Sequence, residues 1–249
     1  MATGALVPDP DNPVTLPAVG TVADAITRLE AIQAYVVAHS PRGANDGVAC
    51  FNYLYLQVTR DVLDKITTGF FADPDFLTRL DLVFVNRYLD ALRADAADPS
   101  SAPSSWKALL EARSDTSIAP MQFAVAGVNA HVNFDLPCTV VTTCQQDDRP
   151  PDTGDQRADY DKVNQIFAEH MADLRQHFEG RLERWLDQHL FVAVADHLGD
   201  WSVVAARDTA WANAKVLWSL RLNHLDEDDF VCSLDRLTGL AGRGVLAHV

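Results

Sequence analysis

Four hydrogen-bonding side chains alternate with other residues in the segment AGVNAHVNFDLPC, residues 126–138: Asn129, His131, Asn133 and Asp135. Histidine is the usual general acid or base near neutral pH, and a carboxylate one helical turn away can orient its ring and hold its proton. Asparagine amides can donate hydrogen bonds to a developing oxyanion. The segment therefore contains the residue types that proton-transfer catalysis needs.

Helical periodicity places this segment in a helix that is apolar on opposite faces. One stripe holds Met121, Val125, Val128, Val132 and Leu136, and the other holds Phe123, Ala126, Ala130 and Phe134. Such a helix is expected to be covered on both sides. Asn129 and Asn133 then share one flank, and His131 and Asp135 share the other. Pro137 lacks a backbone donor and predicts a kink beside these polar groups.

A purely structural explanation of the same residues stays open. Asp135 could be the N-cap of a new helix that starts at Leu136, and His131 could be a core histidine with its hydrogen bonds satisfied. The two asparagines could tie neighbouring helices together. Each buried polar group needs a partner in either case, because an unpaired one costs about 1–3 kcal/mol.

Other polar side chains interrupt apolar helices elsewhere in the chain. We expect six of them to converge on one cavity between helices, a usual ligand site in helical bundles: Asn52, Asn86, Asn129, His131, Asp135 and Arg207. The expected catalytic groups are His131, Asp135, Asn129 and Asn86, and the expected substrate-binding groups are Asn52, Tyr88, Asn133, Arg207 and Trp211. The competing explanation for each of these residues alone is a side chain that bridges helices or extends to solvent.

The periodicity of apolar residues predicts helices over most of the chain. They cover residues 21–39, 47–70, 74–96, 105–115, 118–144, 159–197, 201–222 and 228–240, with Thr21, Asp73 and Asp200 as N-caps. Residues 1–20 contain four prolines and are expected to form an extended arm rather than a signal peptide, and 146–158 a polar loop, the best candidate for a mobile excursion. The sequence thus predicts one all-α domain, a bundle of about eight helices around a central, buried helix kinked at Pro137.

The composition restricts the partners of this domain. The 249 residues include 35 acidic and 20 basic ones, a formal net charge of -15, which disfavours nucleic acid and anionic membrane surfaces. No apolar run approaches the roughly 18 residues of a membrane span. The four cysteines are expected to be buried free thiols in a reducing cytoplasm, because they are few for a chain of this length.

Several blocks of the sequence resemble an uncharacterised bacterial family, a domain of unknown function. The central block is NAHVNFDLP together with the preceding PMQFAVAG. GVACFNYLYLQVT, FLTRLDLVFVNRYLDAL and WSVVAARDTAW are similar to its other blocks, so the resemblance covers most of the chain. It implies no activity, but it supports reading these blocks as parts of one site.

Three functions are compatible with these residues. The first is an enzyme that acts on a small, largely apolar molecule by His/Asp general acid–base chemistry, as an isomerase, cyclase, lyase or simple hydrolase, without a cofactor. The second is a zinc hydrolase in which His131 and Asp135 are ligands, with Asp81 or His197 as a third. The third is a helical protein that binds an apolar ligand or partner without catalysis. A metal site at His170, Asp173 and His177 is less favoured than a solvated face, because that helix is densely charged.

Overall fold

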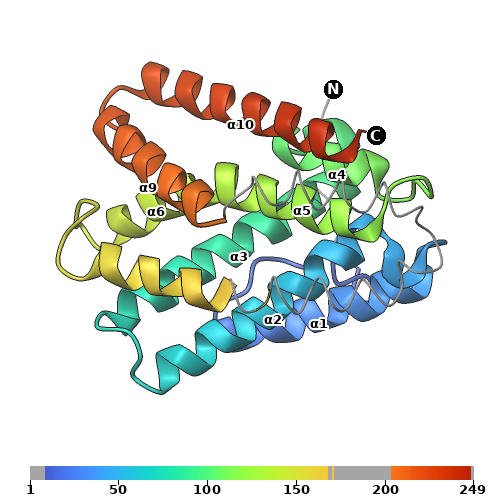
Figure 1. Cartoon of the computed structure of the whole chain (residues 1–249), viewed down its shortest axis with the longest axis horizontal. Coiled ribbons are helices and arrows are strands. Elements are labelled where there is room, and N and C mark those ends of the chain that lie inside the picture. Colours follow the sequence, from blue (N-terminus) through green and yellow to red (C-terminus); the bar gives the residue numbers. More distant parts are fainter. Residues whose placement is uncertain (1–8, 168–169, 171–202, 248–249) are drawn as a thin grey trace.

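The computed structural model describes residues 9–167, 170 and 203–247, and this part of the chain is all-α, as predicted. Figure 1 shows the helices packed as a bundle. They are α1 (Val22–His39), α2 (Gly47–Thr67), α3 (Pro74–Ala97), α4 (Ser104–Ala112), α5 (Pro120–Ala130), α6 (Leu136–Gln146), α9 (Val203–Leu220) and α10 (His224–Leu246), and residues 156–167 are also helical. Short 3-10 turns precede α2 and α4, at Gly43–Asn45 and Pro99–Ser101.

The predicted N-caps of the first and third helices are confirmed. The Thr21 side chain accepts a hydrogen bond from the backbone N–H of Asp24, and the Asp73 side chain accepts one from Phe76. These bonds satisfy backbone donors that a helix leaves free at its start. The expected cap at Asp200 and most of the helix expected over 159–197 lie outside the described residues.

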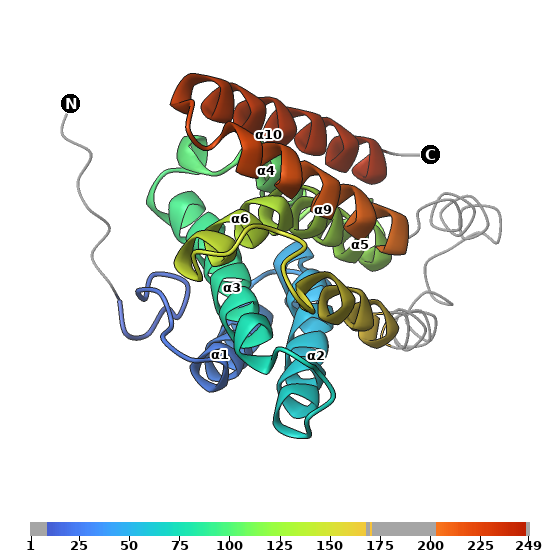
Figure 2. The same cartoon turned by 90° about the vertical axis from the view of Figure 1, so that its left-hand side faces the viewer.

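The central helix of the prediction is α5 and α6, joined through His131–Asp135. It contacts α2 and α4 through α5, and α3 and α9 through α6, while α10 packs against α4 and α5. Figures 1 and 2 show α5 and α6 between these helices. Both predicted apolar stripes are buried, from Met121 and Phe123 to Phe134 and Leu136, so burial on both sides is confirmed.

The last helix is longer than predicted, because α10 runs to Leu246 through three glycines. A Cβ atom on Gly239 would lie 2.8 Å from the carbonyl carbon of Ser104, and one on Gly242 would lie 3.1 Å from Cβ of Ala108. Glycine therefore lets α10 approach α4 closely, and this packing offsets the weak helix propensity of the residue.

The N-terminal arm and the polar loop are both tied to the bundle. In the arm, the backbone of Val19 exchanges two hydrogen bonds with the Asn86 side chain of α3. In the loop, Arg149 pairs with Asp73, and Asp152 accepts from the indole of Trp211. None of the described helices is long and apolar enough to cross a membrane.

The burial predicted for the cysteines is confirmed for three of the four. The side chains of Cys50, Cys138 and Cys144 are buried, whereas Cys232 is exposed on α10, and none of these four described cysteines forms a disulfide. The prediction of a buried thiol was wrong at this position because this face of α10, at one side of the bundle, has no covering helix among the described residues.

Candidate functional site

The candidate site is built on one π-helical turn, His131–Asp135, between α5 and α6. The backbone N–H of Leu136 donates to the carbonyl of His131, five residues earlier, whereas a regular α-helix uses the fourth residue. The helix is thus irregular where the sequence predicted a kink, but the irregularity is a π turn that ends before Pro137. Such turns are frequent at functional sites.

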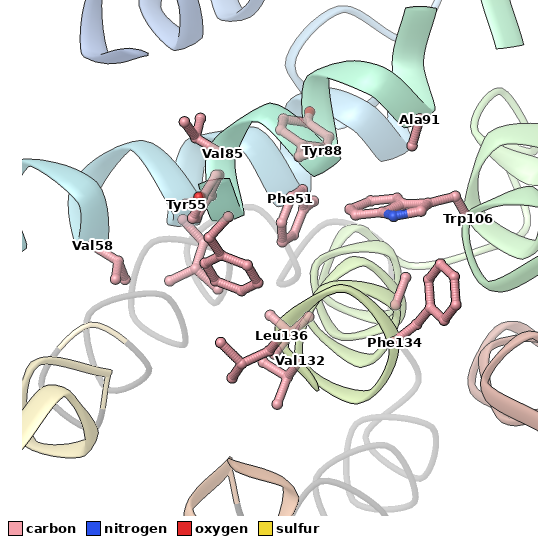
Figure 3. Packing of buried hydrophobic residues seen from close by; sticks show 14 of the residues in the cluster. Phe51, Tyr55, Val58, Val85, Tyr88, Ala91, Trp106, Val132, Phe134 and Leu136 are labelled. Atoms are coloured by element: carbon pink, nitrogen blue, oxygen red, sulfur yellow. The ribbon is translucent and has the colours of Figure 1, made fainter. Parts of the chain in front are cut away.

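Two hydrogen bonds meet on one carboxylate oxygen within this turn. Nδ1 of His131 and Nε1 of Trp106 each lie 2.9 Å from Oδ2 of Asp135. The exposed fractions of the three residues are 1%, 0% and 2% for His131, Trp106 and Asp135. Figure 3 shows Trp106 reaching from α4 toward the turn that carries Val132 and Phe134. Asp135 is therefore held in one orientation by α4 and by its own helix.

Aromatic rings enclose the imidazole of His131. The Phe84 ring stacks on it with a centroid distance of 3.5 Å and an interplanar angle of 7°, and the Tyr55 ring meets it edge-on at 4.6 Å. Its Nε2 atom is buried without a hydrogen-bond partner among the described residues. Burial lowers the pKa of His131, and the neighbouring Asp135 opposes this shift. The ring is accordingly neutral near pH 7, with its proton on Nδ1 and an unused acceptor at Nε2.

Tyr55 and Phe84, two of the rings that contact His131, also line a small cavity of about 30 Å³. Its lining includes Tyr55, Phe84 and Leu136, together with the polar groups of Asp81 and Arg207. Oδ2 of Asp81 is buried without a hydrogen-bond partner among the described residues. Burial raises the pKa of Asp81 to about 7. The cavity is large enough for a water molecule, which needs roughly 10–15 Å³, and too small for an organic substrate as it stands.

A separate, open groove of about 560 Å³ is lined by Phe134 and Asp135 of the turn. One wall is formed by α3, including Asn86 and Arg87, and the other by Phe134, Asp135 and Thr142. Asp135 therefore lines the groove and also holds the buried His131. This groove has the size of small-molecule sites in proteins, which span roughly 300–1,000 Å³.

The predicted asparagine residues of the central helix are paired with each other and with α10. Nδ2 of Asn133 donates to Oδ1 of Asn129 at 3.0 Å, and Nδ2 of Asn129 donates to the carbonyl of Thr238 at 3.0 Å. The predicted sharing of flanks, Asn129 with Asn133 and His131 with Asp135, is confirmed. The pair Asn129–Asn133 ties the central helix to α10, which is the bridging role considered for it.

Asn86, Asn52 and Tyr88 also bond to neighbouring elements. Asn86 lines the groove, but its amide is engaged with the backbone of Val19. Nδ2 of Asn52 donates to the Leu29 carbonyl, and the hydroxyl of Tyr88 donates to Oδ1 of Asn52 at 3.4 Å. Asn52 and Tyr88 thus join α1, α2 and α3.

Arg207 and Trp211 of α9 face the helical residues 156–167 and the polar loop. The Arg207 guanidinium lies 4.2 Å from the ring centroid of Tyr160 and donates to Asn164. The indole of Trp211 donates to Asp152. The six polar residues expected in one cavity therefore fall into separate groups: only Asn86 and Asp135 share the groove, and only Arg207 lines the small cavity. The reason is that several of these side chains are engaged by other parts of the chain: Asn86 by Val19 of the arm, Asn52 by Leu29 of α1 and Asn129 by Thr238 of α10.

Several groups around the turn were not among the predicted site residues. Nothing in the sequence distinguishes Trp106 and Phe84 from ordinary apolar core residues of an amphipathic helix. Arg87 could have been predicted as a site residue, because it is a charged residue next to Asn86 in the strongly apolar stretch LVFVNRYL. Asp81 was considered only as a zinc ligand.

The described residues contain no group of three or more His, Cys, Asp or Glu side chains that could hold a metal ion. His170 instead lies 2.7 Å from Asp61 through Nε2 and Oδ2. Asp173, His177 and His197 lie outside the described residues.

The comparisons with known proteins concern the whole chain. The model of a family described as "Family of unknown function (DUF5995)" matches residues 22–248. No curated protein and no solved structure matches the chain.

Proposed function

We propose that this chain, which belongs to the DUF5995 family of unknown function, is an enzyme that acts on a small, largely apolar molecule by acid–base chemistry at its π turn. The observation that carries the proposal is that Asp135 both pairs with His131 and lines the groove. Its carboxylate accepts a hydrogen bond from Nδ1 of the buried His131, and the residue also lines the open groove. A fixed carboxylate on the wall of a groove is the arrangement that a general base needs.

The geometry favours Asp135 as the group that meets the substrate, with His131 behind it. Both hydrogen bonds from Trp106 and His131 go to Oδ2, and no donor among the described residues bonds to Oδ1. Oδ1 is thus the oxygen left to accept a proton from a molecule in the groove. His131 and Trp106 fix the carboxylate plane, so that little reorganisation is needed when the proton moves.

The arrangement of Asp135, His131 and Trp106 best supports a reaction in which a proton is removed from a carbon atom and returned to one. Asp135 removes a proton from the carbon next to a carbonyl group, and the electron pair moves toward the carbonyl oxygen. The proton then returns to the same or a neighbouring carbon, which gives an isomerisation. If a leaving group departs instead, the step is an elimination.

Deuterium exchange tests this proposal without knowledge of the natural substrate. A panel of small ketones, keto acids and unsaturated acids is incubated with the protein in D₂O, and deuterium incorporation is followed by NMR. A base that removes a carbon-bound proton exchanges it with solvent. We expect exchange with at least one compound, and a loss of roughly 100-fold or more in Asp135→Asn, the range of general base catalysis.

The matched control is Asp155→Asn, which removes an exposed carboxylate from the polar loop. This variant should catalyse deuterium incorporation at the same rate as the natural chain. Asp135→Asn is compared only after near-ultraviolet circular dichroism shows a native fold. Equal exchange in Asp135→Asn would refute the assignment of the base. Binding without exchange would favour the non-catalytic binder.

A further inference from the structure

Among the described residues, Arg87 of α3 is the only arginine that lines the groove beside Asp135. It lies on one face of the helix with Val83 and Ala91, each four residues away, and these two residues also line the groove. On the opposite wall are Phe134 and Asp135 of the π turn. The groove therefore combines a guanidinium group with apolar surface on both sides.

The guanidinium of Arg87 has no protein partner in the described part of the chain. None of the ion pairs found there includes it. Its Nε atom is buried and has no hydrogen-bond acceptor among the described residues. A buried donor without an acceptor costs about 1–3 kcal/mol, so an unpaired guanidinium calls for another explanation.

The carboxylates nearest to Arg87 in the groove are already engaged. Asp90, three residues along α3, pairs with Arg93. Asp135 accepts from Trp106 and His131. Burial is the main cause that lowers the pKa of His131, and the charge of Arg87 contributes in the same direction. The groove thus contains a positively charged side chain, although the formal net charge of the chain is -15.

We infer that this groove binds a small organic monocarboxylate, with its carboxylate on Arg87 and its apolar part between Val83, Ala91 and Phe134. A guanidinium matches a carboxylate with two parallel hydrogen bonds. One cation suits one negative charge, and the neighbouring Asp90 and Asp135 would repel a phosphate dianion. That this carboxylate is the substrate rests on the proposed function, whereas its binding does not.

The probe is hexanoate, and its uncharged counterpart hexanamide has the same chain. Both are titrated into the full chain labelled with nitrogen-15 in arginine, and the Nε–Hε signals are followed by NMR. We expect hexanoate to shift the Arg87 signal and hexanamide to bind at least tenfold more weakly. Arg87→Met should weaken hexanoate binding at least tenfold, and Arg87→Lys, which keeps the charge without the second hydrogen bond, should fall between.

The control is Arg60→Met, because Arg60 pairs with Glu30 between α2 and α1 and does not line the groove. It should bind hexanoate like the natural chain. Equal binding of hexanoate and hexanamide would overturn the inference, and so would undiminished binding in a folded Arg87→Met variant. Stronger binding of inorganic phosphate than of hexanoate would also overturn it.

The Asp135→Asn variant separates this inference from the proposed function. If the variant binds hexanoate as well or better but exchanges no deuterium, both proposals stand. If the natural chain binds hexanoate and Asp135→Asn exchanges deuterium normally, only the proposed function fails. If exchange depends on Asp135 and hexanoate does not bind, only the carboxylate inference fails.

Discussion

The indole nitrogen of Trp106 donates a hydrogen bond to Oδ2 of Asp135 over 2.9 Å. This bond joins α4 to the π turn in a part of the core where both residues are almost fully buried. It explains why a short helix such as α4 matters for the candidate site, since its tryptophan fixes the carboxylate of Asp135, a residue that lines the groove.

Trp106→Phe should lower the free energy of unfolding by about 2–3 kcal/mol. The change removes a hydrogen bond to a charged group, which is worth about 1.5–3 kcal/mol, and leaves a small void. The control is Trp211→Phe, which removes a similar bond to the half-exposed Asp152 and should cost about 1 kcal/mol. Urea unfolding followed by circular dichroism measures both. Equal losses would show that the Trp106 bond contributes no more than a peripheral one.

The charge state of His131 should make the protein sensitive to mild acid. Burial lowers its pKa from the ordinary value of 6.5, so the folded chain binds fewer protons than the unfolded chain below that pH. The free energy of unfolding should therefore fall as pH drops through 6.5, by at most about 1.4 kcal/mol per pH unit. His131→Phe can keep the stacking on Phe84 and removes this titration.

The measurement is urea unfolding of both proteins between pH 8 and pH 5. His131→Phe should be less stable at pH 8, because Asp135 loses a donor, but its stability should change less between pH 7 and pH 5. A parallel pH dependence in the two proteins would mean that His131 keeps an ordinary pKa in the folded chain.

The predictable part of the structure is the part that local chemistry determines. Thr21 and Asp73 cap their helices through side chains that reach backbone donors three residues away, so short-range sequence is enough. The pairing of His131 with Asp135 also follows from a spacing of four. Burial of the central helix followed from its two apolar stripes.

The rest depends on contacts between distant residues. The π turn is a change of backbone hydrogen bonding at His131, and no side-chain pattern specifies it. The partners of the turn, Trp106 and Phe84, come from other helices. The length of α10 depends on the close approach of Gly239 to α4, whereas glycine alone predicts the end of a helix. Tertiary packing decides each of these features.

Asp81→Asn should stabilise the protein at alkaline pH. The pKa of Asp81 is raised from 3.8 to about 7 by burial, so the folded chain holds a proton that the unfolded chain releases. The ionised carboxylate therefore destabilises the fold, increasingly from pH 4 upward and fully above pH 7. At 1.4 kcal/mol per pKa unit the gain for the amide at pH 8 is about 4 kcal/mol, and it disappears below about pH 4.

Urea unfolding at pH 8 and pH 4 checks this expectation, with Asp155→Asn as the exposed control that should change stability at neither pH. If Asp81→Asn were less stable than the natural chain at pH 8, the carboxylate would have to be ionised and stabilised by a partner. Such a result would direct attention to Arg207, which lines the same cavity.

Gly127→Ala should disturb the site from one turn away. A Cβ atom at Gly127 would lie 2.6 Å from Cβ of Phe51, an atom close to the backbone of α2 that a change of rotamer cannot move. Overpacking of this kind costs about 1–3 kcal/mol. The Phe51 ring also meets the rings of Trp106 and His131 edge-on, at centroid distances of 5.3 and 5.7 Å. The shift of Phe51 should therefore reach the imidazole.

The matched variant is Gly244→Ala in α10, where a Cβ atom would meet nothing within 4 Å. It should raise the free energy of unfolding by about 0.5 kcal/mol, because alanine has the higher helix propensity. Urea unfolding measures both variants, and the imidazole NMR signals show whether only Gly127→Ala moves His131. If Gly127→Ala were as stable as Gly244→Ala with unchanged imidazole signals, α2 and α5 would have to be free to separate, and Phe51 could not hold the rings around His131 in place.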